Sequence, residues 1–228
     1  MSISGNLHAV YERINKAALE CGRDPQTIRL VAVSKTQPAS AVQDAVEAGH
    51  LLFGENYVQE FREKSSRLPD VIEWHFIGSL QTNKVKYLAG RTKLIHSVDR
   101  ISLARELDRQ WEKTGQNCNI LLQVNISGEE TKSGTTGSEV IQLAQDIARL
   151  PNLSIRGLMT MPPFFDQPER ARPYFRELRK LSQTVADLKI PGVNMDELSM
   201  GMSGDFEVAI EEGATLVRVG SAIFGERH

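Results

Sequence analysis

The chain has 228 residues, of which 40% are hydrophobic and 25% charged, with a formal net charge of −2. This balance excludes the strongly basic surface of a nucleic-acid-binding protein and favours a globular protein with a small-molecule partner. No apolar run approaches the roughly 20 residues of a membrane span, and the N-terminal stretch lacks the apolar segment of a secretory signal. Cys21 and Cys118 have no metal-ligand spacing, so we expect a cytoplasmic protein with reduced thiols and no metal.

Short apolar runs alternate with amphipathic stretches along the whole chain. A helix is predicted first, over about residues 4–22, and we expect it to cover the bottom of the fold. Strands are predicted at 28–35, 51–56, 73–79, 93–99, 119–127, 154–162, 196–204 and 215–225. Helices are predicted between them at 38–49, 56–68, 81–90, 100–115, 137–152, 168–189 and 205–214. Ser138 is the expected N-cap of the helix at 137–152.

Eight strands, each separated from the next by a helix, predict an α/β fold with parallel strands. In a chain of this length, eight repeats favour a single (β/α)8 TIM barrel with an extra N-terminal helix, in one domain over residues 1–228. An open, doubly wound sheet is the alternative. The glycine-rich GxGxxG motif does not follow the first strand, so we expect no dinucleotide site.

The chemistry of such a barrel belongs at the C-terminal ends of its strands, and the first strand, "IRLVAVSK", ends in Lys35. One interpretation is a surface lysine whose stem packs on the barrel while its ammonium reaches water. The other is an amine with a pKa lowered by burial, able to attack an aldehyde or ketone.

The last two strands are each followed by a turn that contains glycine and serine, in "MGMSGDF" and "VRVGSAIFG". Each segment can be a simple tight turn, or its main-chain N–H groups can form a phosphate-binding cup. A phosphate opposite a reactive amine points to a phosphorylated aldehyde, pyridoxal 5′-phosphate. Arg218 is then either a salt-bridge partner or a cation that faces the pyridine nitrogen and keeps it unprotonated.

Several long segments resemble one known family. They are "AVSKTQP", "FGENYVQE", "WHFIGSLQTNK", "LLQVNIS", "TKSG", "RGLMTM", "LSMGMSGD" and "VRVGSAIFG". In this order they resemble the pyridoxal phosphate homeostasis proteins, the YggS-like family, which is similar to the barrel domain of alanine racemase and other fold-type III enzymes. The resemblance runs from about residue 7 to residue 226.

The resemblance implies a cofactor, pyridoxal 5′-phosphate, and a set of residues that bind it. These are Lys35, Asn56, Ser199, Met200, Ser203, Arg218, Gly220 and Ser221. Lys35 would hold the cofactor as an internal aldimine, Asn56 would lie beside the ring, and Arg218 would face the pyridine nitrogen. Three further residues have open roles: His75, Ile77 and Lys132.

The expected function is that of a carrier without catalytic residues, which buffers the cofactor and delivers it to apo-enzymes as a monomer. The sequence ends at His228, soon after the last strand, and leaves no room for the second domain of alanine racemase. A racemase also needs a base on each face of the substrate, and neither Tyr57 nor another tyrosine is a clear second base. Amino-acid racemisation is the alternative, and an aldolase-like use of Lys35 on a sugar phosphate is a third hypothesis.

Overall fold

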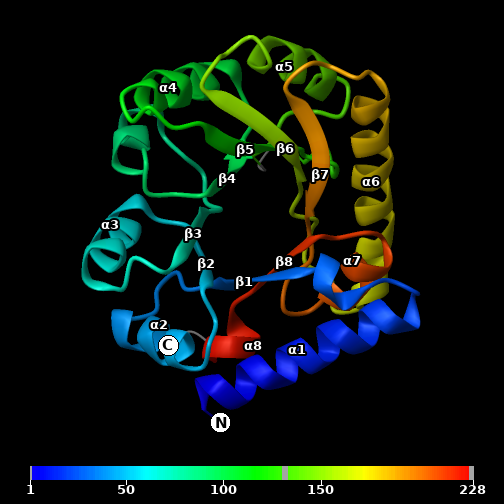
Figure 1. The fold of residues 1–228 in the computed structure, drawn as a ribbon. Coiled ribbons are helices and arrows are strands. Elements are labelled where there is room, and N and C mark those ends of the chain that lie inside the picture. Colours follow the sequence, from blue (N-terminus) through cyan, green and yellow to red (C-terminus); the bar gives the residue numbers. More distant parts are fainter. Residues whose placement is uncertain (1, 130–132, 226–228) are drawn as a thin grey trace.

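The computed structural model describes residues 2–129 and 133–225, and its centre is a closed barrel of eight parallel strands in chain order. The strands are β1 (Arg29–Val33), β2 (Leu52–Glu55), β3 (Glu73–Phe76), β4 (Leu94–Val98), β5 (Cys118–Gln123), β6 (Leu153–Met159), β7 (Val193–Ser199) and β8 (Leu216–Val219). The barrel closes where β8 pairs with β1, with Val31 opposite Arg218. Closure confirms the predicted TIM barrel and excludes the open sheet (Figure 1).

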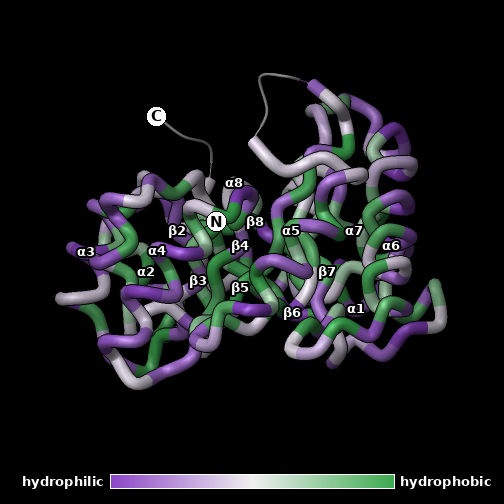
Figure 2. Tube along the Cα trace, turned by 90° about the horizontal axis from the view of Figure 1, so that it is seen from above, coloured by the Kyte–Doolittle hydropathy of each residue, from purple (hydrophilic) through white to green (hydrophobic). Residues whose placement is uncertain are grey.

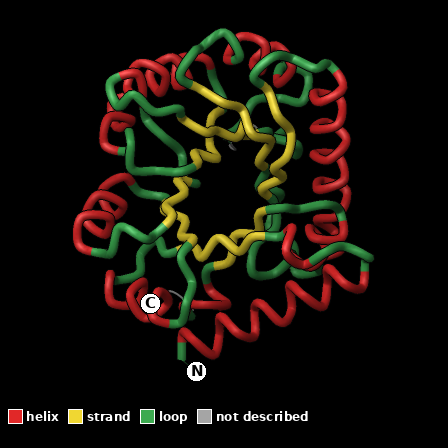
Figure 3. The backbone as a smooth tube through the Cα atoms, in the orientation of Figure 1, coloured by secondary structure: helices red, strands yellow, loops and turns green. Residues whose placement is uncertain are grey.

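Helices form a ring outside the strands (Figure 3). They are α1 (Ile3–Glu20), α2 (Ala39–Glu47), α3 (Val58–Arg67), α4 (Ile101–Glu112), α5 (Val140–Ile147), α6 (Arg172–Asp187), α7 (Phe206–Glu211) and α8 (Ser221–Phe224). Three 3₁₀ turns supplement them, η1 (Pro25–Thr27), η2 (Thr82–Tyr87) and η3 (Pro168–Ala171), and η2 takes the place of the helix predicted at 81–90. Within the described ranges, none of the helices has both the length and the apolar character needed to cross a bilayer.

Apolar side chains fill two layers. Val31, Leu94, Leu121, Met159 and Leu216 pack together inside the barrel, and a larger cluster lies between the strands and the helices. Strands buried on both faces have nearly continuous apolar runs, which is why the strand pattern was readable from the sequence. The helix α6 alternates between hydrophilic and hydrophobic along its length, as expected for a helix that buries one face (Figure 2).

The N-terminal helix α1 does not cover the bottom of the barrel, contrary to prediction. It runs beside the strands against α7 and α8 (Figure 1). Asn6 Nδ2 donates to the main-chain oxygen of Ile223 in α8 at 2.8 Å, and Arg13 forms an ion pair with Glu207 in α7. The helix α8 is only four residues long, and α1 buries its apolar face in the layer that it shares with α7 and α8.

The N-cap prediction for Ser138 is also wrong. The helix α5 begins at Val140 with Glu139 in the cap position and no side-chain cap. The Oγ of Ser138 lies 3.0 Å from the Oγ1 of Thr136, which also donates to Glu139 at 2.7 Å. The Thr136 and Glu139 side chains therefore organise the turn that precedes α5.

Candidate functional site

A cavity of about 270 Å³ opens at the C-terminal mouth of the barrel. Six of the eight predicted residues line it: Lys35, Asn56, Ser203, Arg218, Gly220 and Ser221. The rest of the wall is mainly apolar, from Val33, Ile77, Met161, Phe164, Phe165 and Met202. Phe164 is 85% exposed, so the loop after β6 presents an apolar side chain at the rim. A mainly apolar wall with a few convergent polar groups is typical of a small-molecule site.

Lys35 reaches this cavity because the chain turns sharply just after β1. Thr36 has a φ of 65°, which places a non-glycine residue in the left-handed region. The turn ends the strand and leaves Lys35 half-buried at the cavity wall. The amine of Lys35 is thereby placed in the wall of the cavity.

Arg218 projects from β8 into the same cavity and is 4% exposed. Its Nη1 donates to the Oγ of Ser199 at 2.5 Å, and its Nη2 donates to the main-chain oxygen of Thr160 at 2.9 Å. Burial lowers the pKa of Arg218 to about 10, while nearby Asp205 opposes this effect. Arg218 is therefore a fixed cation at neutral pH.

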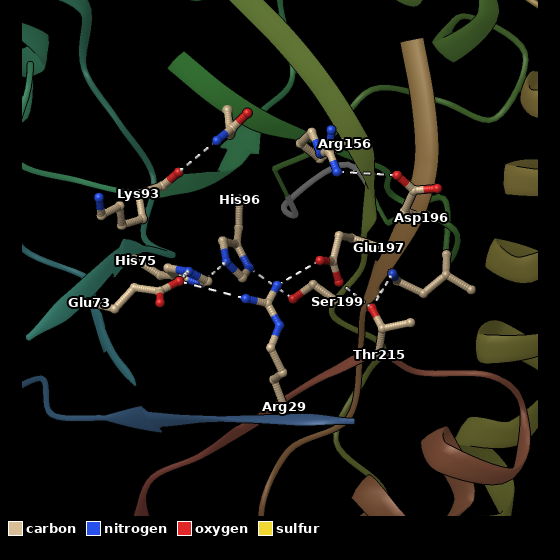
Figure 4. Close-up of polar contacts among 12 residues, drawn as sticks. Arg29, Glu73, His75, Lys93, His96, Arg156, Asp196, Glu197, Ser199 and Thr215 are labelled. Carbon is tan, nitrogen blue, oxygen red and sulfur yellow. Dashed lines mark hydrogen bonds and ion pairs between the residues drawn. The ribbon is translucent and has the colours of Figure 1, made fainter. Parts of the chain in front are cut away.

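A row of hydrogen-bonded side chains runs through the barrel interior beneath Arg218. Ser199 Oγ lies 2.9 Å from His96 Nδ1, His96 Nε2 lies 3.0 Å from His75 Nδ1, and His75 Nε2 lies 3.1 Å from Glu73 Oε1. Figure 4 shows His96 between His75 and Ser199. All of these residues except Glu73 are almost completely buried.

The donors in this row follow from the chemistry of its two ends. The Glu73 carboxylate can only accept, so His75 donates to it from Nε2, and a neutral His75 accepts on Nδ1. His96 must then donate from Nε2 to His75 and accept on Nδ1 from the hydroxyl of Ser199. Arg218 can only donate, so Ser199 Oγ also accepts from its Nη1. Burial lowers the pKa of both histidines, so both are neutral, and the geometry assigns both to the Nε2–H tautomer.

The other end of the row reaches the N-terminal end of the barrel. The guanidinium of Arg29 lies 3.6 Å from Glu73 and 2.6 Å from Glu197 (Figure 4). The side chains of Arg29 and Glu73 are each 41% exposed. A polar path therefore connects the cavity to solvent at the opposite end of the barrel.

The turn after β7 brings Ser203 against the start of α8. Ser203 Oγ accepts from the main-chain N–H groups of Gly220 and Ala222 at 3.3 and 3.5 Å. The turn requires a glycine, since Gly201 has a φ of 90° and a Cβ there would lie 2.6 Å from the Cβ of Ala209. Main-chain N–H groups at the start of α8 and the hydroxyl of Ser203 are donors of the kind that a phosphate oxygen accepts.

Asn56 stands at the end of β2 with its Oδ1 buried and without a hydrogen-bond partner in the part of the chain that the structure describes. Its main chain is fixed by Gly78, where a Cβ would lie only 2.1 Å from the oxygen of Asn56. A buried acceptor at a cavity wall fits a ligand that brings a donor.

The other two predicted residues, Ser199 and Met200, are not among those that line the cavity. Ser199 is fully buried behind Arg218, and Met200 points into the apolar layer between strands and helices. Ile77 lines the wall, whereas His75 lies in the barrel interior. Lys132 lies outside the described residues.

Sequence reasoning did not single out two residues that the structure brings to the site. Asp205 lines the cavity, accepts from the main-chain N–H of Met202 at 2.6 Å, and has a pKa raised by burial. His96 supports Arg218 through Ser199. The described residues hold no cluster of three or more histidine, cysteine or acidic side chains suited to a metal ion.

The barrel and its site define a class of protein. The family model of the alanine racemase N-terminal domain matches residues 6–228. An alanine racemase from Clostridium difficile has the same fold, with a TM-score of 0.76 at 12% identity; the likeness covers 99% of this chain and 57% of the racemase. At that identity the likeness concerns the fold alone.

Closer relatives identify the family within this class. The pyridoxal phosphate homeostasis protein of Aquifex aeolicus is 46% identical over 228 residues, covering 100% of this chain and 99% of the relative. PipY of Synechococcus elongatus, solved with PLP bound, has a TM-score of 0.84 and 33% identity, covering 98% of this chain and 100% of that one. The chain thus belongs to the pyridoxal phosphate homeostasis proteins, in agreement with the resemblance found in its motifs.

Proposed function

We propose that this chain binds pyridoxal 5′-phosphate (PLP) covalently at Lys35 and serves PLP homeostasis as a carrier. The observation that supports this most directly is the convergence of an amine, a buried cation and a phosphate-type cup on one cavity wall, at Lys35, Arg218 and Ser203. The PLP bound to the related PipY supports the choice of ligand. Storage and delivery to apo-enzymes within the cytoplasm is the role that fits such a carrier.

The residues present fit the cofactor at each of its polar groups. The hydroxyl of Ser203, with the N–H groups at Gly220 and Ser221, would hold the phosphate. The amine of Lys35 would hold the cofactor through its aldehyde. The unpartnered Oδ1 of Asn56 would accept from a donor on the ring.

The cofactor supplies an aldehyde that condenses reversibly with amines and a ring that takes up electrons. Arg218 would limit the uptake of electrons by the ring. A guanidinium donates but cannot protonate the pyridine nitrogen at neutral pH, so the ring stays a weak electron acceptor. Holding the aldehyde without transforming it is what a carrier needs. Because the bond to Lys35 reverses with water or another amine, the cofactor can be released.

The visible absorption spectrum of the purified protein tests the proposal. We expect an absorbance band of bound cofactor that disappears in Lys35→Ala while the far-ultraviolet circular dichroism is unchanged. An unchanged band in Lys35→Ala would contradict the proposal. A colourless protein that is trapped by borohydride only with a ketose phosphate would favour an aldolase-like enzyme.

The match to the alanine racemase domain makes amino-acid racemisation the second candidate. Racemisation needs a base on each face of the substrate carbon. Among the described residues of the cavity wall, the ionisable side chains are those of Lys35, Arg218 and Asp205. Tyr57, the tyrosine considered as a second base, lines a different hollow next to this cavity. Incubation of the cofactor-loaded protein with L-alanine in heavy water decides between the two. Deuterium entering Cα at enzymatic rates would establish a racemase.

A further inference from the structure

We infer that Lys64, Glu55 and Glu60 form a charged cluster, buried at Lys64 and Glu55 and partly exposed at Glu60, that fixes the backbone on both sides of Lys35 and thereby orients its amine. The inference rests on the proposed covalent role of Lys35. It assigns a positioning function to three residues that lie outside the cavity wall.

The cluster is built around an ammonium group with almost no access to water. The side chain of Lys64 is 5% exposed and that of Glu55 is fully buried. The Nζ of Lys64 lies 2.7 Å from Oε1 of Glu55 and 3.1 Å from Oε2 of Glu60. It also lies 2.6 Å from the main-chain oxygen of Ser34. Three acceptors for one nitrogen require all three N–H donors of a charged lysine.

Both neighbours of Lys35 are held by this cluster. Ser34 is bonded twice, through its main-chain oxygen to Lys64 and through its Oγ to Oε1 of Glu55 at 2.7 Å. On the other side, the main-chain N–H of Thr36 donates to Oε2 of Glu60 at 2.7 Å. Lys35 is thus the single residue between two backbone positions that the same charged groups hold.

The hydrogen bond from the Thr36 N–H to Glu60 matters because the backbone conformation of Thr36 is strained. A β-branched residue with a φ of 65° does not adopt this conformation unless its surroundings impose it. The carboxylate of Glu60 accepts from the N–H of that residue and so stabilises the turn. Loss of the bond would let the chain relax toward an extended conformation and move Lys35 away from the cavity.

Stability alone does not account for such a cluster. A buried ion pair often adds nothing to stability over a pair of apolar side chains of similar size. The Oε2 of Glu55 is buried without a partner among the described residues, and burial raises the pKa of Glu55. The hydrogen bonds of the charged cluster hold Ser34 and Thr36. The need to position Lys35, which lies between these two residues, explains why the chain keeps a cluster that stability alone does not explain.

The test compares Glu60→Ala with a matched control, Glu63→Ala. Both lie on α3, but Glu63 is 65% exposed and pairs with Arg67. The rate of covalent bond formation with PLP is followed by absorbance after mixing with the apo-protein. The affinity for pyridoxine 5′-phosphate, which has no aldehyde, reports the cavity alone. Hydrogen exchange at the Thr36 amide reports the bond itself.

We expect Glu60→Ala to slow bond formation by about tenfold or more, as small misplacements of a reacting group do. Exchange at Thr36 should accelerate, and the affinity for pyridoxine 5′-phosphate should not change. Glu60→Gln, which keeps an acceptor oxygen, should recover most of the lost rate. In a folded Lys64→Met variant, judged by circular dichroism, the rate should fall at least as far.

An unchanged rate in Glu60→Ala would overturn the inference, and so would an equal loss in Glu63→Ala or an equal loss of pyridoxine 5′-phosphate affinity. These failures differ from failure of the proposed function. A wild-type protein that forms no bond at Lys35 overturns the proposed function, whereas a wild-type bond that is insensitive to Glu60→Ala overturns only the role of the cluster.

Discussion

The guanidinium of Arg218 and the hydroxyl of Ser199 are 2.5 Å apart, and this contact is the upper end of the row of hydrogen bonds beneath the cavity. Because the Glu73 carboxylate at the other end only accepts and both histidines are neutral, the protons of Ser199, His96 and His75 all point toward Glu73. Three neutral side chains, those of Ser199, His96 and His75, thus support the buried cation of Arg218.

Nuclear magnetic resonance of the imidazole nitrogens checks this direction. We expect the ¹⁵N shifts of His75 and His96 at pH 7 to show a protonated Nε2 and an unprotonated Nδ1 in both rings. His8, which is exposed on α1 beside Glu12, serves as a reference for a histidine at the surface. A protonated Nδ1 on His96 would reverse the row and contradict the assignment of Ser199 as its donor.

Removal of the Ser199 hydroxyl should weaken the fold. Ser199→Ala leaves one Arg218 donor and His96 Nδ1 without their partner in a site that excludes water. We expect a loss of about 1–3 kcal/mol in the free energy of unfolding, measured by urea titration. Ser40→Ala, at an exposed position on α2, is the control and should change stability little. Equal stabilities of the two variants would show that the row contributes nothing.

Stability should fall in mild acid because of His96. Burial, together with the neighbouring His75 and Arg218, lowers the pKa of His96 well below the ordinary 6.5. Below that pH the unfolded chain binds a proton at this site and the folded chain does not, so the free energy of unfolding declines as pH falls. The slope for one such group is at most about 1.4 kcal/mol per pH unit.

The variant His96→Asn tests this dependence through the slope rather than through absolute stability. We expect the decline of the free energy of unfolding below pH 6.5 to become shallower in His96→Asn and to persist in His8→Asn. Identical slopes in wild type and His96→Asn would mean that His96 is already protonated in the folded protein.

Ser203 should contribute to phosphate recognition specifically. In Ser203→Ala the hydroxyl at the start of α8 is lost while the N–H groups of Gly220 and Ala222 remain. We expect about a tenfold loss of affinity for PLP, the effect of one hydrogen bond to a charged group, and little change for pyridoxal, which has no phosphate. Equal losses for both ligands would place the phosphate elsewhere.

The strand order and the position of Lys35 were predictable because they follow from local pattern. A strand that is buried on both faces has a continuous run of apolar residues in the sequence. The residue that follows such a run lies at the C-terminal mouth of the barrel. The predicted strands were longer than those observed, 28–35 against Arg29–Val33 for example, since the sequence pattern runs on into the turns at the rim.

The supporting residues were not predictable in the same way. In the sequence, Lys64 looks like an ordinary charged residue of an amphipathic helix. Its burial depends on contacts with Ser34 and Glu55, which lie at the ends of two different strands. His96 stands in an apolar strand, with its partners on β3 and β7. The placement of α1 depends on its contacts with α7 and α8, which no hydrophobic pattern reveals.

Mass spectrometry after hydride reduction tests the central claim most directly. Borohydride converts the reversible bond between protein and PLP into a permanent one, and peptide mapping then locates it. The account predicts one pyridoxyl-modified residue, Lys35, and none in Lys35→Ala. A modification on any other lysine of the wild-type protein, or none at all, would contradict it.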